Sequence, residues 1–174
     1  LKKIIANESN DPIALFTLGR IYRRKKDFHK AVDYFKKCYK VSDIRNRVKS
    51  ADQIGGTLRE WINVPTLSNE EKEKIKKKAV ELYQSFLTPY PDDKRLKYGL
   101  AKAYLLEPLK NGDILKGVEI LTGILKSEIK DRETIKELLY LWAKYDNNTI
   151  KEIISGKSEL FQNNHTFLLR EIIK

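Results

Sequence analysis

The sequence predicts an all-α fold in which antiparallel helical hairpins stack into a solenoid. Apolar residues recur every three or four positions along most of the 174 residues, which is the spacing of a buried helix face. No stretch alternates apolar and polar residues as a strand would. The 5 prolines lie at the edges of the periodic segments, and Gly55, Gly56, Gly112 and Gly156 are expected to lie at such edges as well.

The clearest hairpin spans residues 12–45. Asp11 precedes Pro12, so a carboxylate can cap the helix while proline occupies its first position, where the missing N–H costs nothing. Two apolar stripes follow, one for each helix. The first stripe is Leu15, Leu18 and Tyr22, and the second is Phe28, Ala31, Val32, Phe35 and Tyr39.

This hairpin resembles the tetratricopeptide repeat. Leu15, Leu18-Gly19 and Tyr22 match the first helix of that family, with leucine where tryptophan is often found, and Asp27-Phe28, Ala31 and Phe35 match the second. We expect the small residues Gly19 and Ala31 to let the two helices approach closely, with larger apolar side chains beside that contact. The resemblance implies a tetratricopeptide-like right-handed solenoid that acts as a protein-interaction module or scaffold.

The second unit, residues 46–93, matches the pattern only in part. Its first half offers four apolar candidates, namely Val48, Ile54, Leu58 and Trp61. Gly55-Gly56 is expected to be a loop or a break in a weak helix. Ser68, with Glu71 three residues later, forms a capping box that predicts a helix from Asn69 to Leu87.

Two further units, residues 94–131 and 132–165, are recognisable from fragments of the same pattern. Helices are expected from Lys94 to Leu106 and from Ile114 to Lys126. The segment between them, which contains Pro108 and Gly112, is four residues longer than the matching turn of the clear hairpin. A helix from Arg132 to Tyr145 follows, then a short one near Thr149 to Ile154 and a last one running to the end. Apolar residues near both ends predict partial helices, so the single domain of residues 1–174 is expected to be an excerpt of a longer chain.

No catalytic, cofactor or metal motif is found. His29 and His165 have no partners at ligand spacing, and Gly55-Gly56 is not followed by a phosphate-loop sequence. No segment approaches the length needed to span a bilayer, and the single Cys38 favours a reducing compartment, so a cytoplasmic protein is expected. The sequence therefore predicts a binding protein and not an enzyme, with no cofactor and no metal.

The candidate binding site is a basic groove. The formal charge is +11, of which residues 1–45 supply +7, although lysine enrichment alone is an alternative explanation. In the resembled family the first helix of each hairpin lines the groove, which implies two trios of groove residues, Phe16, Arg20 and Arg23, and Arg95, Tyr98 and Lys102. The spacing of each trio places it on one helix face.

Guanidinium groups beside aromatic rings suit the carboxylates of an acidic protein segment, which is the expected partner. The alternative is that these cations are solvated and the rings of Phe16 and Tyr98 pack against neighbouring helices. A different class of function, binding of nucleic acid such as RNA, could use the basic run from Arg20 to Lys30. The family members that clamp a terminal carboxylate use a groove asparagine that is absent from these faces.

Overall fold

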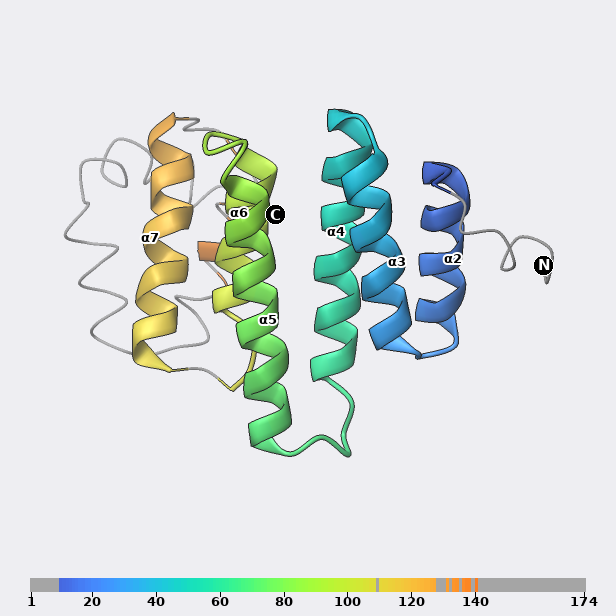
Figure 1. Ribbon diagram of the computed structural model, residues 1–174. Coiled ribbons are helices and arrows are strands. Elements are labelled where there is room, and N and C mark those ends of the chain that lie inside the picture. Colours follow the sequence, from blue (N-terminus) through green and yellow to red (C-terminus); the bar gives the residue numbers. More distant parts are fainter. Residues whose placement is uncertain are drawn as a thin grey trace.

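The computed structural model describes residues 10–108 and 110–127, together with residues 131, 133–134, 136–138 and 140 (Figure 1). Six helices have defined bounds, and the described residues contain no strand. The helices are α2 (Pro12–Arg24), α3 (Phe28–Val41), α4 (Ile44–Ile62), α5 (Asn69–Leu87), α6 (Lys94–Tyr104) and α7 (Asn111–Ser127). The all-helical fold predicted from the apolar spacing is confirmed.

Helices that follow one another in sequence also lie side by side in space. Each helix from α2 to α6 packs against the next, and α4 also packs against α6 (Figure 1). The arrangement is a row of three antiparallel hairpins, α2/α3, α4/α5 and α6/α7. It is the tetratricopeptide-like solenoid that the sequence predicts.

Polar caps begin the helices where the sequence places them. The carboxylate of Asp11 accepts hydrogen bonds from the backbone N–H groups of Ile13 and Ala14, at 3.1 and 3.2 Å. Ser68 and Glu71 form the predicted capping box. Asp27, Asp43 and Asp93 cap α3, α4 and α6 in the same way. Because each cap satisfies backbone donors that the helix leaves free, each fixes a start point locally.

The prediction of a loop or break at Gly55-Gly56 is wrong. Both glycines lie inside α4, which runs unbroken for 19 residues. Glycine costs about 1 kcal/mol relative to alanine in a helix interior. A continuous apolar face offsets that cost, since Val48, Ala51, Ile54, Leu58 and Ile62 are all buried.

Two smaller differences concern the third hairpin. The first helix ends at Tyr104, two residues before the predicted end, and α7 begins at Asn111, three residues before the predicted start. Gly112 is therefore helical, whereas Pro108 lies in the connecting loop as predicted. Of the predicted helix from Arg132 to Tyr145, residues 133–134, 136–138 and 140 are described and helical. The remaining predicted helices and both partial terminal helices lie outside the described residues.

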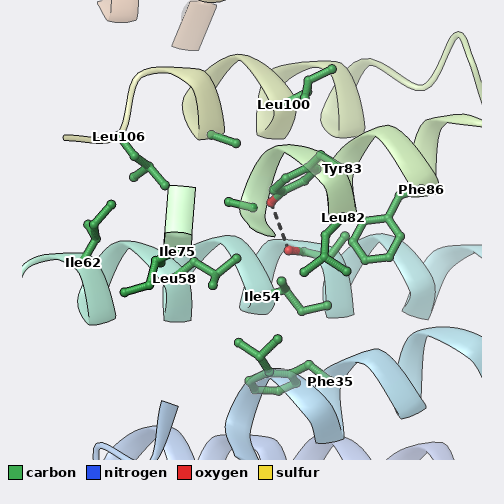
Figure 2. Packing of buried hydrophobic residues seen from close by; sticks show 14 of the residues in the cluster. Phe35, Ile54, Leu58, Ile62, Ile75, Leu82, Tyr83, Phe86, Leu100 and Leu106 are labelled. Atoms are coloured by element: carbon green, nitrogen blue, oxygen red, sulfur yellow. Dashed lines mark hydrogen bonds between the residues drawn. The ribbon is translucent and has the colours of Figure 1, made fainter. Parts of the chain in front are cut away.

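One hydrophobic core runs through the three hairpins. Figure 2 shows Phe35 from α3, Ile54 and Leu58 from α4, and Tyr83 from α5 meeting in adjacent layers, and all four are among the buried residues. The ring of Phe35 also covers Gly19 of α2. A Cβ atom at Gly19 would lie 2.6 Å from the Phe35 Cε1 atom, so the predicted close approach at Gly19 is confirmed. Ala31 is fully buried in the same core.

Candidate docking groove

The first helices of the three hairpins, α2, α4 and α6, lie along one side of the molecule. Helices α4 and α6 pack directly against each other. Helix α2 reaches α4 through Arg23, whose Nη1 donates to Gln53 Oε1 at 2.9 Å and whose Nε donates to Glu60 Oε1 at 3.1 Å. The predicted groove residues come from this side, so its contacts decide which of them can meet a ligand.

Of the first predicted trio, only Arg20 is exposed. The ring of Phe16 packs edge-on against Phe35 with 5.5 Å between the ring centroids. The guanidinium of Arg23 bridges to α4, and its hydrogen bond to Glu60 lowers the pKa of that carboxyl below the ordinary value of 4.5. Phe16 and Arg23 therefore serve mainly to join neighbouring helices.

Of the second trio, Arg95 is exposed, while Tyr98 and Lys102 contact Glu137. The Lys102 Nζ atom lies 3.3 Å from Glu137 Oε2, and the Tyr98 hydroxyl donates to the same oxygen at 3.4 Å. Lys102 also lies over the Tyr98 ring, 5.2 Å from its centroid. Burial and the charge of Glu137 raise the pKa of Tyr98, so its hydroxyl stays protonated and remains a donor.

Helix α4 adds two candidate residues that the sequence did not single out, Asp52 and Arg59. Both line a pocket of about 160 Å³ between α4 and α6. The other lining residues are Gly55, Leu58, Ala79, Tyr83, Tyr98, Gly99, Lys102, Ala103 and Leu106. Desolvation raises the pKa of Asp52, and the nearby charges of Arg95 and Arg59 act in the opposite direction.

A spacing in the sequence could have revealed these residues. Asp52, Gly56 and Arg59 stand at the same offsets from Gly55 as Phe16, Arg20 and Arg23 do from Gly19. Two adjacent glycines predict a break in a helix, and that expectation hides the spacing. In the structure, Gly55 and Gly56 are the small residues that let side chains of neighbouring helices approach α4, as Gly19 does in α2. The Tyr83 hydroxyl occupies the space where a Gly55 side chain would begin, and the guanidinium of Arg23 lies against Gly56.

Tyr83 organises the floor of the pocket. Its hydroxyl donates to the carbonyl oxygen of Ala51 at 3.0 Å, which is the dashed line in Figure 2. Its ring also fills the space next to Gly99 of α6. A single α5 side chain thus fits between a glycine of α4 and a glycine of α6, which sets how closely these two groove helices approach.

The basic run proposed for nucleic acid is partly engaged in contacts within the first hairpin and with α4. Lys30 forms an ion pair with Asp27 at 2.8 Å and lies over the ring of Tyr22. His29 lies edge-on against Trp61, with 4.3 Å between ring centroids. Arg24 at the end of α2 and the turn residues Lys25 and Lys26 are exposed.

Other kinds of site have little support in the described part of the chain. It contains no group of three or more histidine, cysteine or acidic side chains that could hold a metal ion. Cys38 is buried, and its Sγ atom donates to the Pro12 carbonyl oxygen at 3.2 Å. Among the helices that the structure describes, none is long and apolar enough to cross a membrane.

Comparison with known proteins agrees with the geometry of the first hairpin. Residues 13–43, which comprise nearly all of α2 and α3, match the tetratricopeptide repeat family. A search of curated proteins finds no significant match to the chain. The chain thus contains a tetratricopeptide repeat at residues 13–43, and its later hairpins continue a helical-repeat solenoid of the same kind.

Proposed function

We propose that this solenoid binds an acidic segment of another protein along the face formed by α2, α4 and α6. Tetratricopeptide repeats generally mediate interactions between proteins or act as scaffolds. One observation carries the more specific proposal: each of the three first helices contributes an exposed arginine, namely Arg20, Arg59 and Arg95. Neighbouring carboxylates engage Arg23 and Lys102, whereas these three guanidiniums lie at the surface.

Arginine suits this role because its planar guanidinium can donate two parallel hydrogen bonds to one carboxylate. Three such groups, one on the first helix of each hairpin, match an extended ligand that carries several acidic residues. Asp52 lies among them and repels a ligand carboxylate directly beside it. The face therefore favours acidic ligand residues near the arginines and disfavours one next to Asp52.

The proposal assigns the chain a binding role without a chemical reaction or a cofactor, in a cytoplasmic setting. The single buried thiol of Cys38 supports a reducing compartment, since a lone cysteine makes no internal disulfide. The net charge of +11 supports an acidic partner, because positive charge raises the local concentration of anionic ligands.

The test uses an array of end-blocked peptides that differ in acidic content. The protein with Arg20→Glu, Arg59→Glu and Arg95→Glu is compared with a control of equal charge carrying Lys37→Glu, Lys40→Glu and Lys74→Glu, all exposed positions on α3 and α5. An exposed ion pair contributes roughly 0.2–1 kcal/mol, so three lost pairs weaken binding on the order of tenfold or more. Circular dichroism checks that the helical content is unchanged.

The wild type and the control should capture acidic peptides, and the groove variant should not. Equal binding by the groove variant and the wild type would rule out this face, as would an array in which acidic peptides bind no better than neutral ones.

The alternative proposal is RNA binding through the run from Arg20 to Lys30. It is supported by three exposed cations where α2 ends, Arg24, Lys25 and Lys26. The stacked rings of Tyr22 and Tyr34, whose centroids are 5.3 Å apart, support it as well. Binding to an oligouridine probe should then weaken steeply and log-linearly as the salt concentration rises. Replacing Arg24, Lys25 and Lys26 by glutamate should abolish RNA binding and leave peptide capture intact.

A further inference from the structure

We propose that the pocket between α4 and α6 accepts one apolar side chain of the acidic segment, so that the recognised ligand is an apolar residue flanked by carboxylates. This inference rests on the function proposed above and makes it more specific. The pocket holds about 160 Å³. A protein cavity of roughly 150 Å³ accommodates a benzene molecule, so the space corresponds to one side chain of leucine or phenylalanine size.

The floor of the pocket is apolar. Leu58, Ala79, Ala103 and Leu106 are buried and line it together with the ring of Tyr83. The only polar atom of the Tyr83 side chain is its hydroxyl oxygen, and that hydroxyl already donates to the Ala51 carbonyl at 3.0 Å. A polar ligand group on this floor would lose its hydrogen bonds to water and gain few in return, whereas an apolar group gains from leaving water.

The rim of the pocket is charged and differs between its two sides. Arg59 and Asp52 belong to α4, and Lys102 and Tyr98 belong to α6. Cations therefore flank the apolar floor from both helices. Carboxylates on residues next to the buried one can reach Arg59 on one side and Lys102 on the other, where they compete with Glu137.

A second hollow between α5 and α7 has a larger volume of about 390 Å³ but a different character. Its walls carry ion pairs between Lys76 and Asp113, at 2.7 Å, and between Lys110 and Glu73, at 3.1 Å. Because these charges already neutralise one another, this hollow favours neither an acidic nor an apolar ligand. The pocket between α4 and α6 is the better docking candidate.

The ligand side of the proposal is tested with end-blocked pentapeptides that carry four glutamates and a variable central residue. Leucine and phenylalanine at the centre should bind on the order of fifty-fold more tightly than alanine, since each fully buried methylene contributes about 0.8 kcal/mol and leucine has three more carbons than alanine. Glutamine, which is close to leucine in length but polar, should bind no better than alanine. The protein is the wild type throughout, so folding does not limit this measurement.

The position of the bound peptide is tested by thiol protection. An Asp52→Cys variant places an accessible thiol at the pocket rim, and the native Cys38 is buried and reacts slowly. Saturation with the leucine peptide should slow alkylation of the new thiol by iodoacetamide several-fold. A Lys40→Cys variant on the exposed surface of α3 should react at the same rate with and without peptide.

Two results would overturn the inference, and they are distinct. If all acidic pentapeptides bind equally whatever their central residue, and the Arg20, Arg59 and Arg95 reversal still abolishes capture, the pocket has no role and the acidic groove stands. If no acidic peptide binds at all, the proposed function fails and the pocket proposal fails with it.

Discussion

The fit between Gly19 and Phe35 makes replacement of that glycine by alanine a sharp test of the packing. A Cβ atom at Gly19 would lie 2.6, 2.7 and 2.9 Å from the Cε1, Cδ1 and Cζ atoms of the Phe35 ring. Non-bonded carbon atoms prefer about 3.5–4.0 Å, so the ring would have to retreat by roughly 1 Å. Phe35 is fully buried and packs against Phe16, which leaves the ring little room to do so.

The magnitude follows from two opposing effects. Alanine is about 1 kcal/mol better than glycine in a helix interior, and overpacking a filled core costs about 1–3 kcal/mol. We expect Gly19→Ala to lower the free energy of unfolding by about 1 kcal/mol. Gly123 in α7 is the matched control, because a Cβ atom there meets nothing within 4 Å. Gly123→Ala should raise the free energy of unfolding by about 1 kcal/mol.

Urea denaturation followed by circular dichroism at 222 nm measures both variants. In thermal melts the difference corresponds to a Tm about 2–4 °C lower for Gly19→Ala and about 2–4 °C higher for Gly123→Ala. In a Phe35→Leu background, Gly19→Ala should lose its cost, because the ring that causes the clash is gone. A Gly19→Ala protein as stable as Gly123→Ala would refute the close approach of Phe35.

Three further predictions concern single contacts. Tyr83→Phe removes the hydrogen bond to Ala51 and should lower the free energy of unfolding by about 1 kcal/mol in urea denaturation, and no change would mean that water replaces the hydroxyl. Lys76→Ala breaks a pair between a buried ammonium and the partly exposed Asp113, and should cost about 2–3 kcal/mol, whereas Lys76→Met should cost less if desolvation dominates. Glu60 has a lowered pKa, so its contribution is complete above the ordinary value of 4.5 and is lost as the pH falls through the lower pKa of the folded state. The urea midpoint of the Glu60→Gln variant should therefore fall less than that of the wild type between about pH 5 and pH 3. An equal fall in the two proteins would contradict the Arg23 contact.

Much of the fold could be predicted because its signals lie within a few residues of one another. Asp11 caps the N–H of Ala14 three residues later, and Ser68 and Glu71 cap each other over the same distance. Apolar spacing of three and four is equally local, so the sequence could predict that these segments are α-helices and where most of them begin. Apolar spacing did not predict a continuous helix through Gly55-Gly56. The reason for the two glycines is tertiary, because Tyr83 of α5 lies against Gly55 and Arg23 of α2 lies against Gly56.

The candidate site was predicted less completely, because its charges pair across long stretches of chain. Arg23 and Glu60 are 37 residues apart, and Tyr98 and Glu137 are 39 apart. The sequence shows that Arg20, Arg23 and Lys102 are cations on suitable helix faces. It does not show that the second and third of these already contact carboxylates, nor that Arg59 joins Arg20 and Arg95 as an exposed guanidinium.

By itself, the sequence determined that this protein is built from helical hairpins, and that residues 13–43 form a repeat of known kind. Those features depend on hydrogen bonds and apolar spacing within single turns of helix. Only the tertiary structure decided which groove cations are exposed and where the pocket lies. The place of the pocket depends on how closely α4 and α6 approach, which is set by the fit of the Tyr83 ring between Gly55 and Gly99. The engagement of Arg23 and Lys102 depends on Glu60 and Glu137, which only the folded chain brings beside them.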